Sequence, residues 1–186
     1  LRWQGMLDHV IQKCAQRPNS KLDPLILDLL RISAYQIFRQ DRVPFSAIVN
    51  DAVNLTREIG RAYAAGFVNA VLRSLTRIRH EPPLPAQPDR EELAAHENTS
   101  FEDWPQPLQN ATLDYLSTTE SHPRWLAERW IVRYGYSSTL AWARFNNTPA
   151  PLTLRTNRIK TDRDTLIKEL EQHAVHVTPA RHAPDG

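Results

Sequence analysis

Arginines and aromatic side chains alternate between residues 121 and 160, and this mixture carries the clearest chemistry in the sequence. Against one acidic residue, Glu128, the segment holds seven bases: Arg124, Arg129, Arg133, Arg144, Arg155, Arg158 and Lys160. Its aromatic residues include Trp125, Trp130, Tyr134, Tyr136 and Trp142. Arginine binds phosphates bidentately and stacks on rings, and aromatic rings can hold unpaired bases. The segment therefore predicts RNA binding, although tryptophans at helical spacing belong more often to a core.

A second basic line is predicted on a helix that contains "AAGFVNAVLRSL", residues 64–75. At 100° per residue, one face of this helix is apolar and the opposite line reads Gly66, Asn69, Arg73, Arg77 and His80. Glycine and asparagine both weaken a helix. We expect Gly66 to allow close packing of another element, and Asn69 to serve either packing or RNA. Arg73 and Arg77 are predicted to contact RNA.

Motifs that would indicate catalysis or a cofactor are missing from the sequence. Its five glycines form no glycine-rich phosphate loop, so a nucleotide-type cofactor has no predicted seat. The single cysteine, Cys14, lies among apolar residues and is interpreted as a core thiol. His173, His176 and His182 have no carboxylate at a ligand spacing, and we predict no metal site. No catalytic, cofactor-binding or metal-binding residue is therefore predicted in this chain.

Charge is strongly segregated, although the formal net charge is only +2. Residues 81–120 hold nine acidic residues and one base, Arg90, which leaves an excess of ten positive charges elsewhere. Such an excess favours polyanionic partners, nucleic acid first among them. No apolar run approaches the roughly 20 residues of a membrane span, and no signal peptide is apparent. We expect a cytoplasmic protein without a membrane partner, and the start on Leu1 leads us to expect a piece of a longer chain.

The elements that must position these residues divide into three parts. Residues 1–79 predict a helical bundle, in which Asp23 caps a helix that begins at Pro24. Residues 80–107 are rich in proline and acid and predict a linker, with packing of the part around Phe101 and Trp104 as the alternative, because these rings are costly to leave exposed. Residues 108–186 predict helices over 121–135, 137–147 and 162–173, with strands over 151–159 and 174–179. The expected fold is mainly α, a helical bundle followed by a small α/β subdomain.

Three blocks of sequence resemble a known family. Residues 22–75 look like the NusB-like RNA-binding domain. Together with "SHPRWLAERWIVRYG" (121–135) and "PLTLRTN" (151–157), they are similar to the front part of the bacterial ribosomal RNA cytosine-C5-methyltransferases known as RsmB, Sun or Fmu. Departures from the family pattern are the long acidic insert and Thr156, where an apolar residue is expected.

The resemblance implies a division of labour. It implies a ferredoxin- or RRM-like subdomain after the NusB-like bundle, and ribosomal RNA as the partner. It also implies a methyltransferase domain beyond Gly186 that carries two catalytic cysteines and binds S-adenosylmethionine. This chain would then bind and position RNA for that domain, without a cofactor of its own.

On this basis we expect RNA contacts from a set of polar residues in both the bundle and the subdomain: Asn69, Arg73, Arg77, Arg124, Arg129, Arg133, Arg155, Asn157 and Lys160. Two alternatives stay open. One is a non-enzymatic, NusB-like regulator of transcription antitermination, which would lack the blocks at 121–135 and 151–157. The other is a protein-docking module whose basic stripe would meet an acidic partner.

Overall fold

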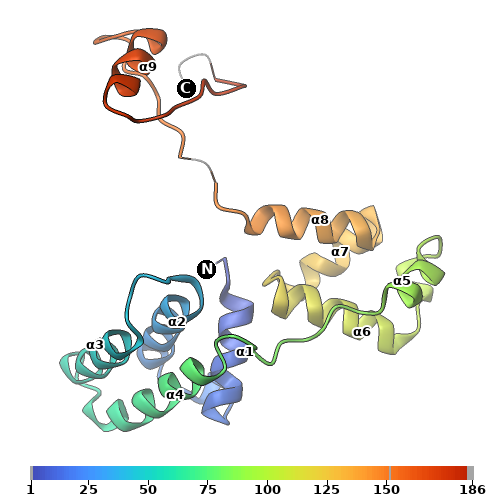
Figure 1. Ribbon diagram of the computed structural model, residues 1–186. Coiled ribbons are helices and arrows are strands. Elements are labelled where there is room, and N and C mark those ends of the chain that lie inside the picture. The colour runs from blue at the N-terminus through green and yellow to red at the C-terminus, as the bar shows by residue number, and fades with distance from the viewer. Residues whose placement is uncertain (1, 151, 184–186) are drawn as a thin grey trace. The chain divides into compact units, whose positions relative to one another are not determined.

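The computed structural model describes residues 2–150 and 152–183, which fold as two compact units that divide between Asn147 and Thr148. The first unit begins with α1 (Gln4–Ala15), α2 (Pro24–Arg39), α3 (Phe45–Glu58) and α4 (Ala65–Arg77), with short 3-10 turns η1 (Asn19–Lys21) and η2 (Ala62–Ala64). It continues with α5 (Arg90–His96), η3 (Phe101–Asp103), α6 (Gln106–Asp114), the π-helical turn η4 (Tyr115–Thr119), α7 (Arg124–Tyr134) and α8 (Tyr136–Asn147). The second unit contains α9 (Arg163–Gln172). Figure 1 shows this order of elements.

Helices α1 to α4 enclose the first hydrophobic core, as the periodicity predicted. Its centre consists of side chains with almost no exposed surface, among them Val10, Ile11, Leu30, Ile48, Val68, Leu72 and Leu75. The predicted apolar face of α4 is the buried one, because Val68, Val71, Leu72 and Leu75 all point into this core. Burial of such side chains stabilises a fold by about 1.5–3 kcal/mol each. The bundle prediction is confirmed.

Asp23 begins α2 and also ties the start of α2 to the segment before α4. Its carboxylate accepts a hydrogen bond from the Leu25 backbone N–H at 2.9 Å, with Pro24 in the first turn. It also accepts from Arg61 Nε at 2.6 Å and from the Tyr63 hydroxyl at 3.3 Å. The hydrogen bond from Arg61 is the main cause that lowers the pKa of Asp23 below its ordinary value of 3.8.

We expect Asp23→Asn to lower the free energy of unfolding at neutral pH and to lose this effect in acid. Asparagine still caps the helix, so the variant removes mainly the charge. A carboxyl group whose pKa is depressed by folding stabilises the folded state above its unfolded pKa, and this contribution is lost as the pH falls through the folded pKa. Urea unfolding of both proteins between pH 7 and pH 2 measures the difference. A difference that stays constant over this range would contradict the assignment.

Residues 80–107, predicted as a linker, contribute instead to a second hydrophobic core. Leu93, Phe101 and Trp104 are buried together with residues of α6, η4, α7 and α8. The rings of Phe101 and Trp104 meet edge to face, with centroids 5.1 Å apart. The chain therefore divides at Asn147, where the sequence had predicted divisions at residues 80 and 107. The packing alternative based on Phe101 and Trp104 is the one that the structure has, so these large apolar residues outweigh the proline and acidic content that favoured a linker.

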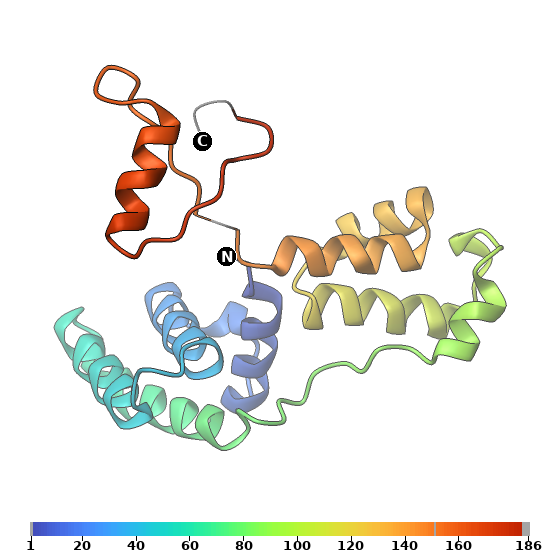
Figure 2. The same ribbon diagram turned by 45° about the horizontal axis from the view of Figure 1, so that its top comes forward.

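The extended stretch 82–88 crosses from the first core to the second as a strap, which Figure 2 shows between α4 and α5. His9 Nε2 lies 2.9 Å from the Pro83 carbonyl oxygen. Thr119 Oγ1 donates to the Pro85 carbonyl oxygen at 2.8 Å. Leu84 packs against the first core. The strap is thus attached to α1 and to η4, the two elements through which the cores meet.

Helix α1 packs directly on η4 and joins the two cores within one unit. Gly5 makes this approach possible, because a Cβ at this position would collide with the Ser117 carbonyl oxygen and lie 3.1 Å from the Ser121 Cα. Trp3, at the N-cap position, provides no side-chain cap. Instead, the Met6 N–H donates to Ser121 Oγ at 2.9 Å, so a residue 115 positions away caps α1. Ser121 adopts φ 56°, a left-handed conformation that is unfavourable for serine.

We expect Gly5→Ala to destabilise the first unit by about 1–3 kcal/mol, because the added methyl forces α1 and η4 apart. Thermal or urea unfolding measures the change. Gly66→Ala is the matched control, since a Cβ on Gly66 meets no atom within 4 Å. This control should hold or gain up to about 1 kcal/mol. Equal stabilities for the two variants would disprove the close approach at Gly5.

The second unit does not contain the expected strands among the residues that the structure describes. Residues 152–157 and 175–180 have extended or irregular backbone without a paired strand, and Pro151 lies outside the described residues. A strand gains its stability from a neighbouring strand and a covered face. Here Leu152, Leu154 and Val175 are exposed. The predicted helix is confirmed as α9, which Asp162 caps through the Thr165 N–H at 2.9 Å.

Candidate RNA-binding surface

The predicted basic line on α4 lies on its outer face. Arg73 and Arg77 are exposed, and Asn69 is half-buried. Asn69 Oδ1 accepts a hydrogen bond from Arg73 Nε at 3.2 Å, which orients the guanidinium. Within the described residues, neither arginine forms an ion pair. Gly66 is exposed and faces open space, so the expected close packing at Gly66 is wrong. The geometry leaves two exposed cations available to a polyanion, and Asn69 orients one of them, Arg73.

Helix α7 presents a second group of predicted residues. Arg129 and Arg133 are exposed, and the Arg133 guanidinium lies 5.3 Å from the centre of the Tyr134 ring. Trp125 is 64% exposed, on the same helix. Arg124, by contrast, contacts the Asp114 carboxylate and donates to Asn110 Oδ1 at 2.8 Å. Arg129, Arg133 and Trp125 therefore form the part of α7 that suits RNA, and the charge of Arg124 is already balanced.

These two groups belong to different helical clusters. Helix α4 packs on α1, α2 and α3, whereas α7 packs on α6, η4 and α8. The sequence placed the α4 line on an outer face but gave no means of relating it to the α7 group. The α4 line and the α7 group are thus separate basic areas on one folded unit.

Arg155, Asn157 and Lys160 lie in the second unit, which is described by itself. Arg155 and Lys160 are exposed. Asn157 has a structural task, because its Oδ1 accepts from the Ile159 N–H at 3.1 Å and its carbonyl oxygen accepts from the Lys160 N–H at 2.9 Å. These bonds form a turn that presents Lys160. Thr156, noted as a departure from the family pattern, is buried.

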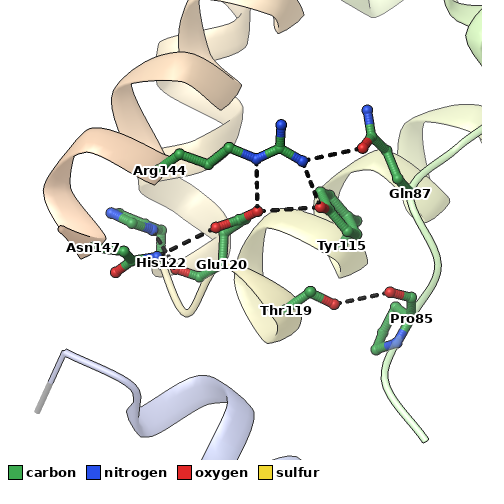
Figure 3. A network of polar contacts seen from close by, with 8 residues as sticks. All are labelled: Pro85, Gln87, Tyr115, Thr119, Glu120, His122, Arg144 and Asn147. Carbon is green, nitrogen blue, oxygen red and sulfur yellow. Dashed lines mark hydrogen bonds and ion pairs between the residues drawn. The ribbon is translucent and has the colours of Figure 1, made fainter. Parts of the chain in front are cut away.

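A polar network that the sequence did not predict joins α8, the end of η4 and the strap (Figure 3). Glu120 is 8% exposed, and its Oε1 accepts from Arg144 Nε at 3.2 Å and from the Tyr115 hydroxyl at 3.1 Å. Arg144 Nη2 also donates to the Tyr115 hydroxyl at 3.1 Å and to Gln87 Oε1 at 3.2 Å. Asn147 Nδ2 donates to the Glu120 carbonyl oxygen at 2.9 Å. No sequence spacing relates these residues, so only the fold reveals them.

The network changes the interpretation of Arg144, which belongs to the basic segment 121–160. The hydrogen bond to Tyr115 is the main cause that raises the pKa of Arg144, and burial raises the pKa of Tyr115. Both groups therefore keep their protons across the physiological range. The Nε and Nη2 atoms of Arg144 are thus occupied by contacts within the fold, so this arginine has a structural role.

We expect Glu120→Ala to destabilise the protein by about 2 kcal/mol, because it leaves Tyr115 and Arg144 without their shared acceptor. Urea unfolding followed by circular dichroism measures the change. Glu128→Ala provides the comparison, since Glu128 is exposed on α7 and forms no ion pair within the described residues. If both substitutions have the same small effect, Glu120 does not hold the network together.

Three further features of the described residues concern metal ligands, the cysteine and the length of the helices. No group of three or more His, Cys, Asp or Glu side chains is placed to hold a metal ion there. Cys14 is half-buried, and burial raises the pKa of its thiol. No described helix is both long and apolar enough to cross a membrane.

Comparison with protein families identifies two segments. The NusB family model matches residues 1–77. The model of the ferredoxin-like domain of RsmF/B-like methyltransferases matches residues 122–186. The residues between these segments, 78–121, include the strap, α5 and α6. No solved structure gave a significant match.

Curated relatives match different shares of the chain. A probable ribosomal RNA small subunit methyltransferase B of Bacillus subtilis is 29% identical over 97% of this chain, which covers 35% of that protein. Ribosomal RNA small subunit methyltransferase B of Pseudomonas putida is 27% identical over 100% of the chain and 36% of its own length. Transcription antitermination protein NusB of Methylococcus capsulatus is 36% identical over 41% of the chain and 37% of its own length. The chain therefore spans about a third of the methyltransferases it matches.

Proposed function

We propose that this chain is the RNA-binding part of a ribosomal RNA methyltransferase, because residues 1–77 match the NusB family model and residues 122–186 match the model of the ferredoxin-like domain of RsmF/B-like methyltransferases. Its task is to bind small-subunit ribosomal RNA and to orient it toward a catalytic domain. Binding and orientation lower a reaction barrier by holding the reacting groups in place. The expected setting is the cytoplasm, where ribosomal RNA is made and modified.

The observation that carries this proposal is the order of both segments in one chain. The methyltransferase relatives align with 97% and 100% of the chain, including the residues between the two family segments. The antitermination relative aligns with only 41% of the chain. A NusB-like regulator would not require residues 122–186, so the methyltransferase interpretation accounts for more of the sequence.

The cationic surface supports the RNA-binding part of the proposal. Arg73 and Arg77 on α4 and Arg129 and Arg133 on α7 are exposed and form no ion pair within the described residues. Arginine forks match phosphate geometry, and the exposed ring of Trp125 can stack on an unpaired base. Arg155 and Lys160 add two exposed cations from the second unit. We assign these residues, with Asn69 as an orienting residue, to RNA contact.

S-adenosylmethionine does not fit the residues described. The cofactor needs backbone N–H groups of a glycine-rich loop between a strand and a helix, and the described glycines Gly5, Gly60, Gly66 and Gly135 form no such loop. Cys14, half-buried with a raised pKa, is unsuited to act as a nucleophile. We therefore place methyl transfer, with cytosine C5 as the proposed target, in the part of the methyltransferase that this chain does not span.

We expect Arg73→Ala with Arg77→Ala to weaken binding to small-subunit ribosomal RNA and to flatten its salt dependence. Each lost phosphate contact lowers the slope of log K against log salt by about one, so the double variant should lose about two. Filter binding or fluorescence anisotropy at several salt concentrations provides the slope.

The matched control is Arg57→Ala, because Arg57 is an exposed arginine at the end of α3 whose Nη1 donates to Asn54 Oδ1 at 3.1 Å. It should leave the slope unchanged. An unchanged slope in the α4 double variant would reject this line as an RNA surface. Absence of RNA binding by the unmodified chain, together with binding of an acidic protein, would favour the docking alternative.

A further inference from the structure

The last residue of α2, Arg39, is an arginine that folding partly covers without pairing it to a carboxylate. Its guanidinium lies 3.5 Å from the centre of the Trp3 ring, and Trp3 is half-buried against the first core. Arg39 Nη2 donates to Met6 Sδ at 3.6 Å, and a thioether is a weak acceptor. Over residues 2–150 and 152–183, Arg39 forms no ion pair. The ring therefore orients the cation while most of its N–H groups meet no acceptor from the described residues.

Two other partly covered arginines of the first unit show what Arg39 lacks. Arg31 Nε donates to Asp8 at 2.7 Å, and Arg61 Nε donates to Asp23 at 2.6 Å. These hydrogen bonds raise the pKa of Arg31 and of Arg61, whereas burial lowers the pKa of Arg39. Arginine nevertheless keeps its proton in proteins. Arg39 is thus a charge that has lost part of its hydration and gained no anion in exchange, which costs free energy.

The carboxylate that attracts Arg39 within the fold is already occupied. Glu120 is close enough to act on the charge of Arg39, but its oxygens accept from Arg144, Tyr115 and Asn147. The place of an anion beside Arg39 is therefore left to a group from outside the chain.

Stacking prepares the guanidinium for an oxyanion. A guanidinium that lies on an aromatic ring keeps its N–H groups in the plane of the fork, where they match two oxygens of one phosphate. Its location suits a long polyanion. Arg39 contacts the first turn of α1, and α1 packs on α4 in one cluster and on η4 in the other, while η4 packs on α7. Arg39 thus lies at the junction of the cluster that carries the α4 line and the cluster that carries the α7 group.

We propose that Arg39, stacked on Trp3, binds a backbone phosphate of the RNA strand. The assignment rests on the proposed function for the presence of RNA, and it adds a contact that the sequence did not predict. Because every nucleotide carries a phosphate, this contact positions the strand at the junction and reads no base. The excess of positive charge outside residues 81–120 favours such a partner over a basic or neutral one.

The decisive variant is Arg39→Met, which keeps an apolar stem over Trp3 and removes the charge. We expect it to weaken binding to small-subunit ribosomal RNA about tenfold at low salt. The slope of log K against log salt should fall by about one, the value of one phosphate contact. Removal of an unpaired, partly covered charge should leave the stability unchanged or raise it. Fluorescence anisotropy at several salt concentrations and urea unfolding measure the two effects.

Arg57→Met is the matched control, since Arg57 is also an arginine in the last turn of its helix and donates to Asn54. It should leave the slope unchanged. Arg39→Lys separates the fork from the charge: the slope should stay, and binding should weaken about threefold. An unchanged slope in Arg39→Met overturns the proposal. Should Arg39→Met not fold, equal RNA binding by Arg39→Lys and the unmodified chain overturns it instead.

NMR spectra distinguish a strand phosphate from a free anion. The Nε–H signal of Arg39, identified by its loss in Arg39→Met, should shift on addition of a single-stranded RNA oligonucleotide. Inorganic phosphate at the same ionic strength should shift it much less, and an equal shift overturns the assignment to RNA. RNA binding that depends on Arg73 and Arg77 but not on Arg39 rejects this proposal and keeps the proposed function. Absence of any RNA binding by the unmodified chain rejects both.

Discussion

The contact of α1 with η4 is the constraint on which the first unit depends. Two hydrophobic cores, one inside α1 to α4 and one around α6 to α8, meet at this contact. Gly5 allows the backbones to approach, and Ser121 accepts the hydrogen bond that the start of α1 would otherwise lack. Helix α4 packs in the first core and α7 packs in the second. The contact of α1 with η4 therefore links the element that carries the basic line to the element that carries the basic group.

The polar network and the strap extend that constraint to α5. Glu120 directly precedes Ser121 and holds Arg144 on α8, and Arg144 in turn holds Gln87 of the strap. The strap then leads into α5, whose Leu93 is buried in the second core. A buried carboxylate is retained only where its partners compensate for lost hydration. Here those partners are Tyr115 of η4 and Arg144 and Asn147 of α8, and Arg144 also holds Gln87 of the strap.

Helical elements could be predicted from the sequence because their signals are local. Asp23 followed by Pro24 marks the start of α2, and the spacing of Val68, Val71, Leu72 and Leu75 gives the buried face of α4. Composition misled where a few side chains decide the outcome. Residues 80–107 look like a linker by their proline content, yet three buried apolar residues fix them.

Features that depend on distant partners could not be found in this way. The sequence correctly placed Arg73 and Arg77 on the exposed face of α4, since helical periodicity alone settles that. It could not show that Asp114 balances Arg124, or that Glu120 holds Arg144, because these partners lie 10 and 24 residues apart. The expected strands are not seen among the described residues of the second unit, since alternation of apolar residues does not by itself supply a neighbouring strand. Gly66 was predicted to be a packing site. The sequence of a helix does not show which elements lie against each of its faces, and a Cβ on Gly66 would meet no atom within 4 Å.

Ser121 also has a consequence for the order in which the chain can fold during synthesis. The first helix is complete in sequence by Ala15, yet its cap is 115 residues away. At usual rates of chain elongation, Ser121 is synthesised on the order of 10 s after Met6. During this interval α1 has an uncapped end, and the apolar face that later meets η4 stays uncovered. The helical bundle is therefore synthesised before the elements that cover it. The hydrogen bond from the Met6 N–H to Ser121 Oγ forms only when the second core is made.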